Sequence, residues 1–142
     1  MDIKAFCYSE TALRHGIDNT PSPDVIENTE WLYKKILDPL EYILGVKVNI
    51  TSGYRSPEVN ALIGGSTTSQ HCLGQAADIN VNNYTPQDLF LFIKQKTQLP
   101  YDQLILEFPP AGWVHISYSR QQRRSQRFIA DKINGKTIYT PG

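Results

Sequence analysis

The longest amphipathic pattern in the chain lies between Asp24 and about Leu44. Apolar residues recur there with the spacing of a helix that buries one face. Pro39 falls inside this stretch, and because proline disrupts a helix interior we expect a kink or two consecutive helices there. Gly45 then ends the helical segment. The apolar positions are Val25, Trp31, Leu32, Ile36, Leu40 and Ile43.

Alternating apolar and polar residues indicate β-strands in the part of the chain after Gly45. Residues 46–51 place valine, valine and isoleucine at every second position, which is the period of a half-buried strand. A second, more apolar strand is expected at 76–81, after a polar loop. Two further strands are expected near 102–108 and 113–118, joined by the tight turn Pro-Pro-Ala-Gly. One more is expected in the tail, at 136–139.

Capping residues predict shorter helices between these strands. Ser9 and Thr85 are suited to helix N-caps, and Pro57 suits the first turn of a helix through Ile63. The sequence shows no repeat, low-complexity segment or linker. We therefore expect a single α+β domain over residues 1–142, with an antiparallel β-sheet packed by helices.

Composition limits the classes of partner. The chain has 142 residues, of which 40% are hydrophobic and 20% charged, as in an ordinary globular domain. Its formal net charge is zero, which favours neither nucleic acid nor an anionic membrane as a partner. The one concentration of basic residues is interpreted as a solvated surface segment, with a weak contact to an anionic polymer as the alternative. It comprises Arg120, Arg123, Arg124 and Arg127.

Cysteine usage and the chain's start bear on its compartment. Cys7 and Cys72 lie far apart, which is no disulfide framework, although a single bridge between them stays open. The N-terminus lacks a basic region followed by a long apolar run, so we expect no signal peptide and synthesis in the cytoplasm. No apolar stretch approaches the about 20 residues needed to cross a bilayer, so we expect no membrane insertion.

Two of the three histidines lie in settings that suggest metal binding. His71 precedes the expected strand at 76–81, Asp78 lies within that strand, and His115 lies in the later strand at 113–118. A catalytic zinc ion takes three nitrogen or oxygen ligands and keeps one position open for water. Adjacent strands are about 4.8 Å apart, so side chains on neighbouring strands can converge on one ion.

Asp78 is the most informative of the three residues. It interrupts the apolar run 76–79, where an unpaired buried carboxylate would be unfavourable. A metal ion, or a hydrogen-bond partner such as Arg55, would offset that penalty. From spacing alone, a solvated aspartate at the end of a strand stays open as the alternative.

Three short motifs follow one another along the chain. They are T-S-G-Y-R-S-P at 51–57, S-x-H-x-x-G-x-A-x-D at 69–78, and W-V-H-I-S at 113–117. In this order they resemble the motifs of the zinc D-Ala-D-Ala carboxypeptidase family, which also contains phage L-alanyl-D-glutamate endolysins. The stretch Y-D-Q-L-I-L-E-F at 101–108 is similar to small phage or prophage members. The resemblance implies a fold shared with the hedgehog signalling domain.

The resemblance also implies a set of site residues. Zinc would be bound by His71, Asp78 and His115. Arg55 would contact a substrate carboxylate or the developing oxyanion, for which a permanently charged guanidinium with paired donors is suited. The alternative for Arg55 is a structural ion pair.

The general base departs from the family pattern. Many members carry an acidic residue three positions before the last histidine ligand, where this chain has Gly112. Glu107 is the nearest carboxylate upstream and lies in an otherwise apolar strand, so we expect it to be the base. An exposed strand residue is the alternative interpretation of Glu107, and Asp102 is the second choice for the base.

The pairing of the strands expected near 102–108 and 113–118 tests the assignment of Glu107 as the base. Directly opposed residues of a hairpin share a face of the sheet. If Phe108 pairs with Trp113, Glu107 points away from His115. If a bulge lengthens the loop, Glu107 opposes His115 and both side chains reach one ion. The assignment of Glu107 requires the second register or an equivalent twist.

The function implied by the resemblance is zinc-dependent hydrolysis of an amide bond in peptidoglycan stem peptides, by carboxypeptidase or endopeptidase action. The protein would be a monomer that acts at the cell wall after release or as a virion component. Two alternatives stay open: a zinc-binding recognition module without catalysis, and a phage structural module.

Overall fold

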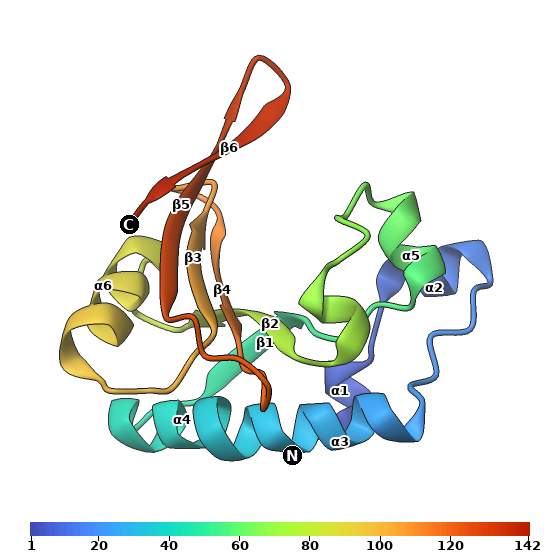
Figure 1. The fold of residues 1–142 in the computed structure, drawn as a ribbon, viewed down its shortest axis with the longest axis horizontal. Coiled ribbons are helices and arrows are strands. Elements are labelled where there is room, and N and C mark those ends of the chain that lie inside the picture. Colours follow the sequence, from blue (N-terminus) through green and yellow to red (C-terminus); the bar gives the residue numbers. More distant parts are fainter.

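The computed structural model describes residues 1–142 and centres on a six-stranded β-sheet (Figure 1). The strands are β1 (Val48–Ser52), β2 (Ala76–Val81), β3 (Gln103–Glu107), β4 (Trp113–Ser117), β5 (Gln126–Ile133) and β6 (Lys136–Pro141). Their order in the sheet is β1-β2-β4-β3-β5-β6. The α+β class is confirmed. The sheet is mixed rather than wholly antiparallel, because β3 and β5 pair in parallel.

The helices are short and have the caps that the sequence predicts. They are α1 (Ile3–Phe6), α2 (Glu10–His15), α3 (Pro23–Leu32), η1 (Tyr33–Leu37), α4 (Asp38–Leu44), α5 (Pro57–Leu62), η2 (Gln70–Leu73) and α6 (Pro86–Lys96). The side chains of Ser9 and Thr85 each accept a hydrogen bond from a backbone N–H of the first turn, at the starts of α2 and α6. None of the helices combines the length and hydrophobicity needed to span a bilayer.

The kink expected near Pro39 takes the form of a π-helical turn. The helices α3, η1 and α4 form one continuous run, seen along the bottom of Figure 1. Proline has no N–H, and its ring would collide with the carbonyl four residues earlier in a regular α-helix. The wider η1 turn, in which the Asp38 N–H bonds to the Tyr33 carbonyl, comes directly before Pro39. The helix therefore continues past the proline.

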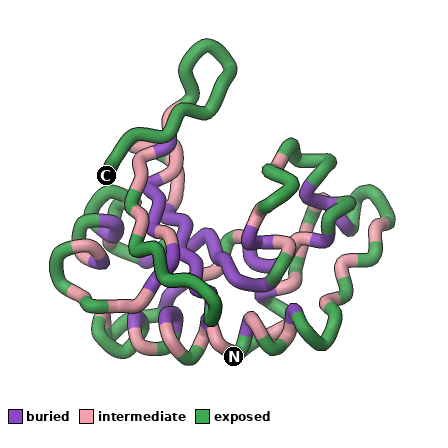
Figure 2. The backbone as a smooth tube through the Cα atoms, in the orientation of Figure 1, coloured by how far each residue is buried: buried purple, intermediate pink, exposed green.

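The hydrophobic core lies between the sheet and the helical run, with α6 as a second cover (Figure 2). Its sheet side comes from every second residue of the strands, such as Ile79, Val114 and Leu104, all fully buried. Each such side chain contributes about 1.5–3 kcal/mol through removal from water. The helical side of the core comprises Leu32, Ile36, Leu37, Leu40, Leu89, Phe90 and Ile93.

The other face of the same strands carries polar side chains. The backbone alternates, so Asp78 on β2 faces away from Ile79, and His115 on β4 faces away from Val114. Asp78 and His115 are directly opposed in the register of β2 and β4. The strand pairing that builds the core therefore also brings these two side chains together.

Strand β5 was not expected from the sequence. Only one of its eight residues, Ala130, is buried, so it lacks the alternation that identified the other strands. It pairs in parallel with β3 and antiparallel with β6. The observed β6, Lys136–Pro141, extends the strand expected at 136–139 by two residues.

The arginines before β5 are largely exposed, as expected, but one anchors the loop. Asp102 is fully buried, and its carboxylate accepts three hydrogen bonds from Arg124 and one from the Gln70 side chain. Burial disfavours ionisation of Asp102, but Arg124 outweighs it and holds the pKa of the carboxyl below its usual value. Asp102 is therefore a structural anchor between η2, β3 and the start of β5, and it is not the general base.

Replacing Asp102 by asparagine tests this anchor. We expect Asp102→Asn to lower the free energy of unfolding at pH 7 by about 2 kcal/mol, less than the about 3–5 kcal/mol for a fully buried pair, because Arg124 reaches solvent. A carboxylate with a lowered native pKa stabilises above its unfolded pKa, about 4, and that contribution is lost as pH falls through the native pKa. Urea unfolding of metal-free protein should therefore give a difference between variant and wild type that shrinks below about pH 4.

Asp131→Asn is the matched control, since Asp131 lies on β5 and forms no ion pair. A difference for Asp102→Asn that stays constant down to pH 2 would contradict the assignment.

Candidate metal centre

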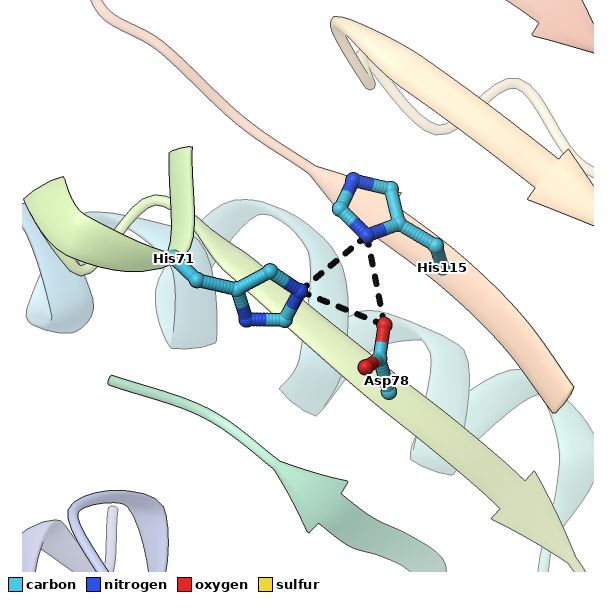
Figure 3. A group of neighbouring side chains, drawn as sticks. All are labelled: His71, Asp78 and His115. Carbon is cyan, nitrogen blue, oxygen red and sulfur yellow. Dashed lines mark hydrogen bonds and ion pairs between the residues drawn. The ribbon is translucent and has the colours of Figure 1, made fainter. Parts of the chain in front are cut away.

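Three side chains from separate elements converge on one point (Figure 3). His71 comes from η2, Asp78 from β2 and His115 from β4. His71 Nε2 lies 3.2 Å from His115 Nδ1 and 3.3 Å from Asp78 Oδ1, and His115 Nδ1 lies 3.2 Å from the same oxygen. All three residues are buried. The convergence expected from the sequence is confirmed.

The spacing of these donors fits a tetrahedral ion. Zinc binds imidazole nitrogen and carboxylate oxygen at about 2.0–2.1 Å, so two ligands of a tetrahedron lie about 3.3 Å apart. The observed separations of 3.2–3.3 Å match that edge. Three ligands also leave the fourth position free for water or substrate, as in catalytic rather than structural zinc sites. The residues present therefore fit zinc.

The hydrogen bond of His71 to a backbone carbonyl fixes which of its ring nitrogens can bind a metal. His71 Nδ1 lies 2.7 Å from the Gly53 carbonyl oxygen, which can only accept, so this nitrogen carries the proton. In a neutral ring, Nε2 then presents a lone pair toward Asp78 and His115. A backbone carbonyl that accepts a hydrogen bond from the other ring nitrogen of a metal-binding histidine, and so orients the ring, is common in zinc sites.

Asp78 is held in its charged form. Burial by itself would raise the pKa of this carboxyl, but the positive charge that His71 and His115 carry when protonated, together with their hydrogen bonds, outweighs burial and holds the pKa well below its usual value. Arg55 forms no ion pair with Asp78, so the structural alternative for that arginine is not realised. The carboxylate is thus available as an anionic ligand.

Local backbone features position His71. Ser69 accepts a hydrogen bond from the His71 N–H at the start of η2, and Gly74 ends η2 in the left-handed conformation. Gly53 has no room for a side chain, because a Cβ there would collide with the Phe6 carbonyl. The close packing of Gly53 against α1 therefore places the carbonyl that holds the His71 ring.

Glu107 reaches the site through a strand pairing that differs from both pairings considered from the sequence. Glu107 pairs with Trp113, and Ile105 pairs with His115. Trp113 and His115 lie two residues apart on one strand and share a face, so Glu107 lies on that face as well. Glu107 Oε1 is 3.6 Å from His115 Nδ1. The two pairings predicted for Glu107, with Val114 and with His115, were wrong. Glu107 and His115 nevertheless lie on one face of the sheet, as the assignment of Glu107 as the base requires.

The glycine that replaces the usual acid has a steric reason. A Cβ at Gly112 would collide with the backbone carbonyl of Glu107 across the loop. No acidic side chain fits at that position in this loop. The carboxylate beside His115 instead comes from Glu107 on the opposite strand.

The surroundings of Glu107 shift the pKa of its carboxyl. Burial raises the pKa of this carboxyl, and the negative charge of Asp78 raises it further, while His115, Arg55 and the Trp113 indole oppose the shift. The net pKa lies above the usual value. The side chain is 18% exposed, so it is accessible from the solvent side of the site.

Arg55 lies beside the site without a side-chain partner. Its backbone N–H donates to the His71 carbonyl at 3.2 Å, which fixes the residue next to η2. Its Nε is buried and makes no hydrogen bond. The side chain lines a cavity of about 220 Å³ together with Ser9, Ser52 and Tyr54, among others. An unpaired buried guanidinium donor is suited to an anionic or carbonyl oxygen of a ligand.

Cys72 is not part of the donor set. The group that could hold a metal consists of His71, Asp78 and His115 alone. Cys72 and Cys7 are both free thiols, so no disulfide joins them.

The arrangement defines a class of protein: two histidines, one aspartate and a nearby glutamate are the parts of a metal-dependent hydrolase. A search of curated proteins found no match. The family model described as Peptidase M15 matches residues 1–117, and the chain belongs to this family, the zinc D-Ala-D-Ala carboxypeptidases. The protein is therefore a metallopeptidase whose cofactor is zinc.

Zinc should stabilise the fold through these donors. A ligand present at a thousandfold excess over its Kd adds about 4 kcal/mol to the stability of the native state. We expect zinc to raise the melting temperature of chelator-treated wild type by several degrees, and Asp78→Asn to lose most of that rise. Asp24→Asn, an exposed change on α3, is the control. An equal rise in Asp78→Asn would place the zinc elsewhere.

Gly53→Ala should disturb the site through backbone packing alone. The added methyl must displace Gly53 or Phe6, which moves the carbonyl that holds His71. Loss of a hydrogen-bond partner that orients a metal ligand weakens metal binding by about 10–100-fold. Zinc titration of the variant should give this change. Gly64→Asn is the control, since the space around Gly64 is open and asparagine tolerates its positive φ. Wild-type zinc affinity in Gly53→Ala would contradict the role.

Proposed function

We propose that the protein hydrolyses an amide bond in the stem peptides of peptidoglycan, with zinc held by His71, Asp78 and His115. The observation that carries the proposal is the approach of Glu107 to the three donors, 3.6 Å from His115 Nδ1. Family membership supports a peptide substrate. The peptidoglycan assignment rests on the likeness of the three motifs to carboxypeptidases and endolysins.

A bound zinc ion supplies Lewis acidity, which lowers the pKa of water toward about 7 and polarises a carbonyl. Glu107 accepts a proton from the attacking water while the water oxygen bonds to the carbonyl carbon. As the carbon–nitrogen bond breaks, Glu107 delivers that proton to the leaving amine. The carboxyl therefore ends the cycle in the state in which it began.

Arg55 is assigned the role of binding a carbonyl or carboxylate oxygen of the substrate. Its buried Nε lacks a partner, so a carbonyl or carboxylate oxygen of the substrate would satisfy it. A permanent positive charge there stabilises the negative charge that develops on the carbonyl oxygen. His71 Nδ1 stays bonded to the Gly53 carbonyl and keeps the donor set aligned.

The proposal includes action at the cell wall, reached by release from the producing cell or within a virion. The amide bond would belong to a wall peptide in either case. The assay substrate is therefore purified peptidoglycan, with mass spectrometry of the released peptides to identify the bond.

Replacing Glu107 by glutamine separates catalysis from zinc binding. Glu107→Gln keeps the shape of the side chain but cannot accept the proton, so we expect hydrolysis to fall by about 10²–10⁴-fold. Zinc content should stay at the wild-type value, because Glu107 is outside the donor set. The measurement is release of new amino groups from purified cell walls, with metal analysis of the same samples.

Glu41→Gln, on the exposed face of α4, is the control. Full activity in Glu107→Gln would refute the role of Glu107. Zinc binding by wild type with no hydrolysis of any wall preparation would support a recognition module without catalysis.

A further inference from the structure

The hairpin of β5 and β6 lies beyond the residues that the family model matches, yet it extends the site face of the sheet. The match ends at residue 117, and the hairpin spans Gln126–Pro141. Glu107 on β3 pairs with Ala130 on β5, and Ala130 pairs with Tyr139 on β6. Paired residues share a face, so Tyr139 lies on the same face as Glu107. Figure 1 shows the hairpin projecting beyond the body of the molecule.

The small residue between them lets Tyr139 approach Glu107. Two strand spacings separate β3 from β6, about 10 Å, which a glutamate and a tyrosine side chain can bridge over a methyl group. Ala130 is fully buried, which indicates that its larger neighbours close over it. The Tyr139 ring also packs edge-on against Phe128, with centroids 6.2 Å apart.

The Tyr139 hydroxyl is suited to donate a hydrogen bond to a ligand. Tyr139 is 55% exposed, and its hydroxyl makes no hydrogen bond within the protein. Burial of part of the ring and the negative charge of Glu107 raise the pKa of the phenol above its usual value. The phenol therefore keeps its proton at neutral pH.

Further side chains continue the same surface. The ring of Phe108 lies 5.5 Å from that of Trp113, and Lys132 Nζ lies 6.0 Å from the Phe108 centroid. Lys132 is two residues after Ala130 on β5 and so shares its face. We call Trp113, Phe108, Lys132 and Tyr139 the hairpin wall. It offers aromatic surface, one cation and one hydroxyl donor beside Glu107.

We propose that the hairpin wall binds the leaving residue of the substrate, with the Tyr139 hydroxyl donating a hydrogen bond to a carbonyl or carboxylate oxygen of that residue. The inference rests on the proposed function, in which Glu107 gives its proton to the leaving amine. The substrate residue that carries this amine must then lie next to Glu107. The hairpin wall lies at the same place. Lys132 adds a positive charge that favours an anionic group there.

Tyr139→Phe removes the hydroxyl and keeps the ring over Ala130, so it separates ligand binding from packing. We expect an about tenfold rise in KM for stem peptides released from purified peptidoglycan, the effect of one hydrogen bond to a charged or carbonyl oxygen. The value of kcat, the zinc content and the melting temperature should change little. Tyr42→Phe is the control, since Tyr42 is 89% exposed on α4.

Binding is measured separately from turnover. Calorimetry with the same peptide fraction compares zinc-loaded Glu107→Gln with Glu107→Gln/Tyr139→Phe, and we expect the second to bind about tenfold more weakly. Equal affinity of the two, or a wild-type KM in Tyr139→Phe, would overturn the inference even if wild type hydrolyses the wall. Tyr139-dependent binding without hydrolysis by wild type would support the wall and refute the proposed function. Absence of any binding would refute both.

Discussion

The fold is organised around a buried point where two imidazole nitrogens and a carboxylate oxygen lie 3.2–3.3 Å from one another. His71 Nε2 presents a lone pair there, because the one ring proton of neutral His71 lies on Nδ1, which donates a hydrogen bond to the Gly53 carbonyl oxygen. Without a cation, such a group is unfavourable in a buried setting. With zinc, the three donor atoms would occupy three corners of a coordination tetrahedron. The pairing of Asp78 with His115 across β2 and β4, and the packing of Gly53 under Phe6, both serve this arrangement.

A second constraint shapes the chemistry beside the metal. The loop between β3 and β4 turns so tightly at Gly112 that no side chain fits against the Glu107 carbonyl. The carboxylate beside His115 comes from across the hairpin, from Glu107, to which we assign the role of the base. The hairpin of β5 and β6 continues from that point and adds Tyr139 to the same row of side chains. Asp78, His115, Glu107 and Tyr139 thus share one face of the sheet.

The sequence was informative where structure is local. The ligand motif at 69–78 and the histidine in 113–117 each carry their residues in a short segment, so the donor set could be predicted before the fold was known. The amphipathic run from Asp24 to Leu44 predicted its helix and the disturbance at Pro39 for the same reason. The sequence predicted that Glu107 shares a face with His115, which the strand pairing confirms, but it did not predict the register. Several loop geometries between Glu107 and Trp113 are compatible with the sequence, and in the observed one a side chain at position 112 would collide with the Glu107 carbonyl.

The sequence was less informative where partners are distant. Strand β5 has one buried residue, so hydrophobic alternation could not reveal it, although Asn134-Gly135 is a hairpin turn signal that points to a strand on each side. Its parallel pairing with β3 brings Tyr139 toward Glu107. Asp102 was the second choice for the base. Its bonds to Arg124 come from a residue 22 positions away in the chain, which no local pattern indicates.

The central claim is that one zinc ion is bound by two imidazoles and one carboxylate. X-ray absorption at the zinc edge, on protein purified without chelators, tests it most directly, because the first coordination shell is observed without a crystal. The account predicts only nitrogen and oxygen neighbours at about 2.0–2.2 Å, with the outer-shell scattering of two imidazole rings. A sulfur neighbour at about 2.3 Å, or a shell without imidazole scattering, would contradict it.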